Sequence, residues 1–161
     1  QKEIDNIVAQ SSYADMVFPK LKFLNNDVMA AFGNGRVVIF EGSQSPQVKK
    51  EIVAEQEIRS IFYNEAYIGL VFENQNTKAR YKMQVYDLNG NEVLSKDFNV
   101  EYREIGFLEN DEICVRGDTE CILYTLHGVE KFHGSFEKNI WKVLSTGRIK
   151  DYIFLTGWIC Y

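Results

Sequence analysis

Apolar and polar residues alternate along most of the chain, or apolar residues gather in runs of roughly four to eight between turn residues. The runs are rich in β-branched and aromatic residues, which is typical of β-strands. Examples are VVIFEG (37–42), YIGLVF (67–72), YKMQVYDLNG (81–90), ILYTLHG (122–128) and DYIFLTGWICY (151–161). The pattern predicts an all-β fold.

One segment also permits a helix. In SPQVKKEIVAEQEI (45–58), Val48, Ile52 and Ile58 lie loosely at helical spacing behind a Ser-Pro pair that is typical of a helix start. The alternative is a polar loop that leads into a strand. The pattern favours the second interpretation.

The chain is similar to itself. FLNNDVMAAFGNGRVVIF (23–40) aligns without a gap with FLENDEICVRGDTECILY (107–124), and VYDLNGNEVLSKDFN (85–99) aligns with LYTLHGVEKFHGSFE (123–137). A further copy begins at NIWKVL, near residue 139, and ends after its second strand. Each repeat therefore has about 40 residues and four short strands, which is the spacing of β-propeller blades.

The repeats define the predicted domain organisation. We expect blades at 20–57, 58–101 and 102–138, and part of a fourth at 139–161, with residues 1–19 as a segment that could complete a blade. One twisted four-stranded sheet cannot bury both of its faces by itself, whereas stacked blades bury them against each other. In each blade, Asn-Asp or Asn-Glu pairs predict the first turn, and Leu-Asn-Gly or Leu-His-Gly predicts the turn into the outermost strand.

The repeat ends VYDLNGNEV and LYTLHGVEK resemble the WD-like and quinoprotein-like propeller superfamily. More specifically, PKLKFLNNDVMAAFG, IRSIFYNEAYIGLVFEN, YKMQVYDLNGNEV and EKFHGSFEKNI resemble the second half of a propeller family of clostridia-type Gram-positive bacteria. The resemblance extends from about Tyr13 to the end. It implies a propeller outside the cytoplasm, anchored in the membrane by an upstream helix, with no assigned activity and no catalytic residues to carry over.

The number of blades leaves two arrangements open. Strands from DNIVAQ (5–10) and ADMVF (14–18) could pair with the last segment and close a four-bladed ring. Alternatively, the chain is the C-terminal part of a ring of roughly six to eight blades, which is the arrangement we favour. An open part of a ring would expose an apolar blade face and predicts a homodimer or aggregation.

Composition narrows the class of partner. Apolar residues make up 45% of the 161 residues, so the chain has enough material for a packed core. The net charge is −5 and no run of Lys or Arg is present, so we expect no nucleic-acid partner. Apolar runs are far shorter than the roughly 20 residues that cross a bilayer. Because the chain opens with QKEIDN and has no Met there, we expect any anchor upstream.

Two cysteines flank an Arg-Gly-Asp tripeptide, Arg116-Gly117-Asp118, in ICVRGDTECIL. If Gly117-Asp118 is a two-residue turn, Cys114 pairs with Cys121 at a hydrogen-bonded position, where Cα atoms are about 5.5 Å apart. That distance permits a disulfide, but the side-chain directions suit one poorly, and we expect two buried free thiols. The aligned repeat has Phe-Gly-Asn here, so the tripeptide is interpreted as a turn rather than as an adhesion motif. Cys160 has no evident mate.

Other candidate residues do not form a recognisable site. We expect no catalytic, cofactor-binding or metal-binding residues, because none of the relevant types occurs at the spacing that its chemistry needs. The residues considered are the histidines His127 and His133, the turn carboxylates Asp27, Asp87, Asp111 and Asp118, and the aromatics Trp141 and Trp158.

Two classes of function follow. The first is a non-enzymatic binding or scaffold propeller on the outer face of the cell membrane that recognises a protein, a peptide or a wall glycan. The second is a propeller enzyme of the glycosidase, lyase or quinoprotein kind, whose channel residues come from several blades and leave no linear motif. A third possibility is that the blades only support a functional domain elsewhere in a longer protein. For the location, the alternative to the extracytoplasmic side is the cytoplasm.

Overall fold

A computed structural model describes residues 20–33, 35–75, 78–145 and 152–156. Within these residues the chain forms fourteen β-strands and no helix, so the all-β prediction is confirmed. A search of the same residues for a helix that could cross a membrane finds none. The segment 1–19, which was expected to complete a blade, lies outside the described residues.

The first four strands form one antiparallel sheet in chain order. They are β1 (Lys20–Phe23), β2 (Val28–Gly33), β3 (Arg36–Glu41) and β4 (Gln47–Val53). The segment that permitted a helix is therefore strand β4, and the helical interpretation is wrong. The strand pairs with β3 from Gln47 to Val53, and this pairing satisfies backbone groups that a helix would otherwise satisfy internally.

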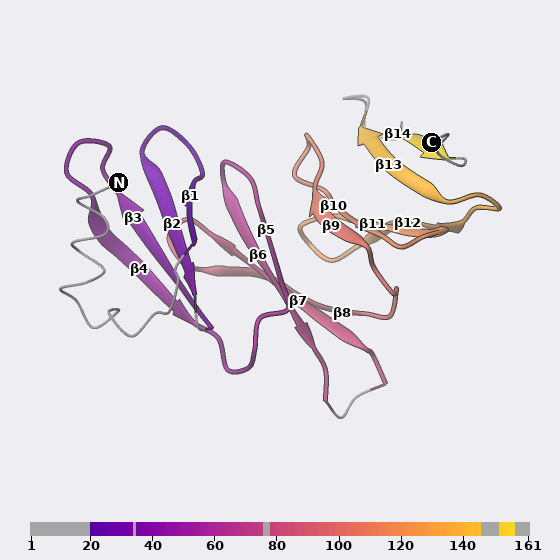
Figure 1. The fold of residues 1–161 in the computed structure, drawn as a ribbon, viewed down its shortest axis with the longest axis horizontal. Coiled ribbons are helices and arrows are strands. Elements are labelled where there is room, and N and C mark those ends of the chain that lie inside the picture. Colours follow the sequence, from indigo (N-terminus) through magenta and orange to yellow (C-terminus); the bar gives the residue numbers. More distant parts are fainter. Residues whose placement is uncertain (1–19, 34, 76–77, 146–151, 157–161) are drawn as a thin grey trace.

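The same order of strands recurs twice. The second sheet contains β5 (Ser60–Tyr63), β6 (Tyr67–Glu73), β7 (Tyr81–Asp87) and β8 (Glu92–Phe98). The third contains β9 (Glu104–Phe107), β10 (Ile113–Arg116), β11 (Glu120–Tyr124) and β12 (Glu130–Ser135). A two-stranded sheet of β13 (Ile140–Ser145) and β14 (Tyr152–Thr156) follows. Figure 1 shows the four sheets side by side in chain order, from the indigo sheet at one end to the yellow strands at the other.

Asparagine side chains organise the turn between the first and second strands. Asn25 Oδ1 accepts hydrogen bonds from the backbone amides of Asp27 and Val28, at 2.9 and 3.0 Å. Asn64 Oδ1 accepts the equivalent pair in the second sheet, at 2.9 and 2.8 Å. These local bonds replace a backbone turn, and they explain why Asn recurs at this point of the repeat.

The turn into the outermost strand also repeats. Asp87 Oδ1 accepts hydrogen bonds from the backbone amides two and four residues later, at 2.8 and 2.9 Å. Thr125 Oγ1 accepts the equivalent pair at 3.2 Å. Gly90 and Gly128 have φ of 78° and 79°, a conformation that side chains disfavour. The Leu-Asn-Gly and Leu-His-Gly sequences therefore encode one turn in two sheets.

The third strand of each four-stranded sheet has a register shift at the same place. The shifts follow Ile39 in β3, Val85 in β7 and Leu123 in β11, which the repeat places at equivalent positions. A bulge bends a strand and increases its twist. The repeats are thus alike in backbone detail as well as in strand order.

Hydrophobic clusters lie between successive sheets. The cluster between the first and second sheets includes Ile39 and Leu70. The one between the second and third sheets includes Met83 and Val115. The one between the third and fourth sheets includes Leu123 and Val143. In β2 both faces are buried, because Ala30 belongs to the first of these clusters while Met29 and Ala31 belong to a separate one. Sheets buried on both faces are what stacked layers require.

A buried polar cluster joins the third sheet to the fourth. Glu112 is 9% exposed, and its carboxylate accepts from Lys131 Nζ and from Tyr152 Oη. Lys131 Nζ also donates to Tyr152 Oη at 2.9 Å. The hydrogen bonds, first to Glu112 and then to Tyr152, raise the pKa of Lys131. Because all three groups bond to one another, the carboxylate is buried with its charge compensated.

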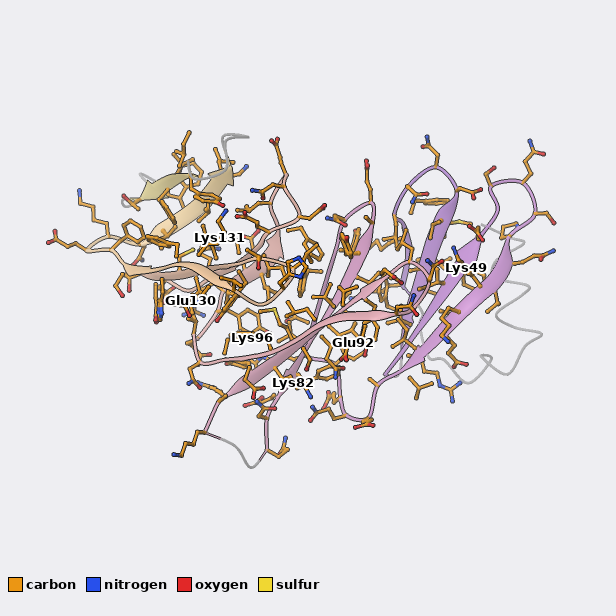
Figure 2. All side chains as sticks on the ribbon, turned by 180° about the vertical axis from the view of Figure 1, so that it is seen from behind. Lys49, Lys82, Glu92, Lys96, Glu130 and Lys131 are labelled. Carbon is orange, nitrogen blue, oxygen red and sulfur yellow. The ribbon has the colours of Figure 1, made fainter. Side chains whose placement is uncertain are left out.

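The third and fourth strands of the four-stranded sheets carry charged side chains (Figure 2). They include Lys49 on β4, Lys82 on β7, Glu92 and Lys96 on β8, and Glu130 and Lys131 on β12. Strands β4, β8 and β12 are the last in their sheets. Charges at such edges disfavour pairing with strands of other molecules.

Candidate functional site

The first strands of the second and third sheets are in direct contact. The rings of Phe62 on β5 and Phe107 on β9 lie 4.9 Å apart. Ser60 Oγ and Tyr102 Oη are 2.6 Å apart, and Asn64 Nδ2 donates to the Asp111 carboxylate at 2.7 Å.

A cleft lies between the first strands of the first and second sheets. Asn25 Nδ2 donates to the Glu65 carbonyl at 3.1 Å and joins the turns that follow β1 and β5. The cleft has a volume of about 590 Å³, within the range of small-molecule sites. It is lined by Lys20, Lys22, Phe32, Gly33, Gly35, Glu57, Ile58, Arg59, Ser60, Ile61 and Tyr63.

Two lysines of β1 face this cleft. Lys20 and Lys22 pair in register with Phe32 and Ala30, which belong to the cluster between the first two sheets. Directly opposed residues share a face of a sheet, so both lysine side chains leave β1 on the side of the second sheet. Both lysines are exposed, and neither side chain makes a hydrogen bond or ion pair within the described part of the chain.

Arg59 also lines this cleft, but its charge is engaged by groups outside it. Its Nη1 atom lies 2.8 Å from Glu73 Oε2, and its guanidinium carbon lies 5.2 Å from the ring centroid of Tyr81 and 5.8 Å from that of Tyr102. The interaction with Tyr81, which is the largest cause, raises the pKa of Arg59, with desolvation opposing it. Because both tyrosines pack in the cluster between the second and third sheets, the guanidinium points away from the two lysines.

Tyr63 contributes an accessible aromatic ring. Its ring stacks on that of Phe32 with centroids 6.3 Å apart and an interplanar angle of 28°. Phe32 is buried, whereas Tyr63 is 39% exposed. A ring supported from behind and open in front can pack against the apolar face of a ligand at a small cost in conformational entropy.

The groups in the cleft suit non-covalent binding. Glu57 is the one carboxylate in the lining, so the pair of carboxylates that glycoside hydrolysis needs is missing from it. The one hydroxyl nucleophile is Ser60, and its Oγ is already bonded to Tyr102. Two lysines face one carboxylate, in a chain whose net charge is −5. The arrangement attracts an anion.

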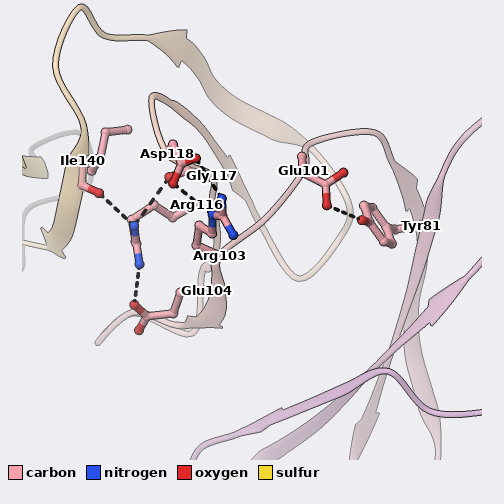
Figure 3. Close-up of polar contacts among 8 residues, drawn as sticks. All are labelled: Tyr81, Glu101, Arg103, Glu104, Arg116, Gly117, Asp118 and Ile140. Carbon is pink, nitrogen blue, oxygen red and sulfur yellow. Dashed lines mark hydrogen bonds and ion pairs between the residues drawn. The ribbon is translucent and has the colours of Figure 1, made fainter.

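A second cleft, of about 280 Å³, lies between the third sheet and β13. Its charged residues are Glu104, Glu109, Arg116 and Lys142, so the two signs balance. Arg116 is bound there by groups of the protein itself, since its Nη1 donates to the Ile140 carbonyl at 2.8 Å and its Nη2 lies 3.2 Å from Glu104 Oε2 (Figure 3). This cleft lacks the excess positive charge of the first one.

The Arg-Gly-Asp tripeptide is engaged within the protein. Besides the contacts of Arg116, the Asp118 carboxylate accepts from Arg103 Nε and Nη2 at 3.0 and 3.1 Å (Figure 3). Hydrogen bonding to Arg103 holds the pKa of Asp118 below its ordinary value. A Cβ atom at Gly117 would lie 2.8 Å from the Glu101 carbonyl oxygen, so this position requires glycine. The tripeptide is a structural connection between strands.

The predicted pairing of the cysteines is wrong. Cys114 lies opposite Leu123, and Cys121 lies opposite Arg116. Gly117 N donates to the Glu120 carbonyl at 2.8 Å, so the two-residue turn is Asp118-Thr119 rather than Gly117-Asp118. This displacement of the turn by one residue shifts each pairing partner by two residues, which keeps both thiols on one face but makes them diagonal neighbours.

Both thiols are free and buried, and their sulfur atoms lie 3.6 Å apart. The hydrogen bond between them, and then burial, raises the pKa of Cys114. The same bond lowers the pKa of Cys121 against the effect of burial, helped by Arg116.

The remaining candidate residues stay apart. His133 Nε2 lies 2.5 Å from Glu120 Oε1 and Nδ1 lies 3.3 Å from Glu130 Oε1, on the outer part of the third sheet, whereas His127 is in a turn. The described residues contain no group of three or more metal-ligating side chains. Asp27, Asp87, Asp111 and Asp118 lie in separate turns, and Trp141 is exposed on β13. Trp158 and Cys160 lie outside the described residues.

Sequence reasoning did not find the β1–β5 cleft. Its lysines come from KLKF (20–23) and its arginine from a loop 36 positions after the last of these residues, so no linear motif connects them. The signal that was available is the pair of lysines two positions apart in KLKF.

Comparisons with known proteins give a family and a fold. The family model described as "Family of unknown function (DUF5711)" matches residues 1–157. No curated protein matches the chain. Among solved structures, one titled "Crystal structure of the eukaryotic initiation factor" matches with a TM-score of 0.54 and 13% sequence identity, over 80% of this chain and 35% of that chain. At this identity the likeness concerns the fold alone.

Proposed function

The chain belongs to the DUF5711 family of unknown function, and from this premise we propose that it is a non-enzymatic β-propeller module that binds a partner through the cleft between β1 and β5. The observation that carries the proposal is the excess of positive charge in an open cleft that has one carboxylate and no free nucleophile. Such a lining favours recognition over chemistry.

The propeller assignment is supported by the repetition of the sheets. Three four-stranded antiparallel sheets have the same strand order, the same bulge and related turns, and hydrophobic clusters join each to the next. In this arrangement β1, β5, β9 and β13 are the inner strands, and the cleft opens beside the axis of the ring.

The location we propose is the outer face of the cell membrane, with an anchor upstream of residue 1, in a clostridia-type Gram-positive bacterium. The support is the resemblance of KLKFLNNDVMAAFG and related segments to an anchored propeller family. Digestion of intact cells with a protease tests it. Loss of the protein from intact cells agrees with the proposal, and protection until lysis contradicts it.

The binding function is tested by retrieval from cell envelopes. The intact chain is immobilised and compared with K20Q/K22Q, which removes two positive charges from the cleft, and with K82Q/K96Q, which removes two from β7 and β8. We expect retention of an envelope component by the chain and by K82Q/K96Q, and its loss with K20Q/K22Q. Equal retention by all three proteins would overturn the role of the cleft, and turnover of a retained component would favour the enzyme class.

A further inference from the structure

We infer that the β1–β5 cleft binds an anionic sugar unit, with its carboxylate or phosphate between Lys20 and Lys22 and its ring on Tyr63. The inference rests on the proposed function, because it names the chemical class of the ligand at the same site. It does not require the ring to be closed.

The charge requirement comes from the two lysines. Side chains two residues apart on one face of a strand start about 7 Å apart, so both flexible ammonium groups can reach one anionic group. Neither Lys20 nor Lys22 has a competing acidic partner in the described part of the chain. Glu57 is the one carboxylate of the lining, so a bound anion meets more attraction than repulsion there.

The ring requirement comes from Tyr63. Its aromatic face carries partial negative charge, and the C–H groups of a sugar ring carry partial positive charge, so the two faces attract. Phe32 supports the Tyr63 ring from behind, which fixes its orientation before the ligand arrives. A volume of about 590 Å³ leaves room for a small number of sugar rings beside the lysines.

An acidic peptide fits less well. An extended peptide would add as a strand along the edge of β1, where backbone groups supply most of the affinity. Strand β1 has only four residues, and two of them are lysines, which at a sheet edge disfavour the addition of a strand. The cleft at β13 has balanced charges, so it lacks this combination.

Calorimetric titration of the intact chain with digalacturonic acid tests the inference, with neutral cellobiose and tetraglutamate as comparison ligands. We expect digalacturonic acid to bind at least tenfold more tightly than cellobiose, and more weakly as NaCl rises from about 50 to 300 mM. K20Q/K22Q should lower the affinity at least tenfold, whereas K82Q/K96Q should not change it. Y63A should lower it and Y63F should not, because the ring rather than the hydroxyl makes the contact.

The outcomes separate the inference from the proposed function. Equal affinity for cellobiose, or equal effects of the two lysine pairs, would overturn the inference. Binding of tetraglutamate alone, lost in K20Q/K22Q, would overturn the sugar class and leave the binding cleft standing. Galacturonate monomer and digalacturonic acid distinguish a free sugar acid from a unit of a polymer, since a polymer site should prefer the longer ligand.

Discussion

Arg116 Nη1 donates a hydrogen bond of 2.8 Å to the backbone carbonyl oxygen of Ile140, the first residue of β13 (Figure 3). The same guanidinium pairs with Glu104 through Nη2. The Arg116 side chain is 16% exposed, so water can replace these contacts only in part. One side chain thus connects two strands of the third sheet with the start of the fourth.

Substitution of Arg116 by lysine should lower the free energy of unfolding by about 1–3 kcal/mol, because an ammonium cannot serve both Ile140 and Glu104 and leaves the carbonyl without its donor. Urea denaturation followed by fluorescence measures this loss. The matched control is R103K, since the Arg103 side chain is 63% exposed and its ion pair with Asp118 should contribute less to stability than the contacts of Arg116. Equal losses in the two variants would contradict the connecting role of Arg116.

Substitution of Gly117 by alanine should destabilise the turn between β10 and β11. The added Cβ would meet the Glu101 carbonyl oxygen at 2.8 Å. Because that oxygen is a backbone atom, the backbone must move to make room for the methyl group. We expect a loss of about 1–3 kcal/mol in thermal or urea unfolding. Gly106 is the control, because a Cβ there meets nothing within 4 Å, and G106A should be neutral or slightly stabilising.

The thiols of Cys114 and Cys121 should remain unmodified in the native protein and react after denaturation. Both are buried, and their diagonal placement keeps the Cα atoms about 7–8 Å apart, which is too far for an unstrained disulfide. Alkylation with iodoacetamide before and after urea, followed by peptide mass spectrometry, checks this expectation. A peptide pair linked through these two residues in the untreated protein would contradict it.

The raised pKa of the buried Tyr124 side chain should lower the stability of the folded protein in alkali. Burial raises the pKa of Tyr124 to about 12, so between about pH 10 and 12 the unfolded chain loses a proton that the folded chain keeps. The contribution is present below about pH 10 and is lost as the pH rises toward 12. Melting temperatures across this range should fall more steeply for the natural sequence than for Y124F. Other tyrosines affect both proteins alike, so parallel curves would refute the effect.

The polar cluster beneath β14 should show coupling between Glu112 and Tyr152. Y152F removes a donor from a buried carboxylate and should lower the free energy of unfolding by about 1–3 kcal/mol. In the double variant E112Q/Y152F the loss should be smaller than the sum of the two single losses, because the hydrogen bond can be lost only once. Additive losses by urea unfolding would show that the two groups act independently.

The repeating strands and turns could be predicted from the sequence because the forces behind them are local. Alternation with period two sets strand faces, Asn25 and Asn64 bond amides two and three residues away, and Gly90 and Gly128 provide a conformation that other residues disfavour. A Ser-Pro start did not produce a helix, because pairing with β3 outweighed a weak helical pattern at β4.

The tertiary structure alone determined the register of the two cysteines and the position of the cleft, because both depend on contacts between residues that are far apart in the sequence. The register of Cys114 and Cys121 followed from a turn that lies one residue later than predicted, beside the contacts of Arg116 and Asp118. The cleft brings the lysines of β1 near Tyr63 because the first two sheets meet at their turns and leave a space between their first strands. The sequence by itself determined the repeated unit, since its turns and faces are local; the packing of one sheet on the next determined which charges and thiols meet.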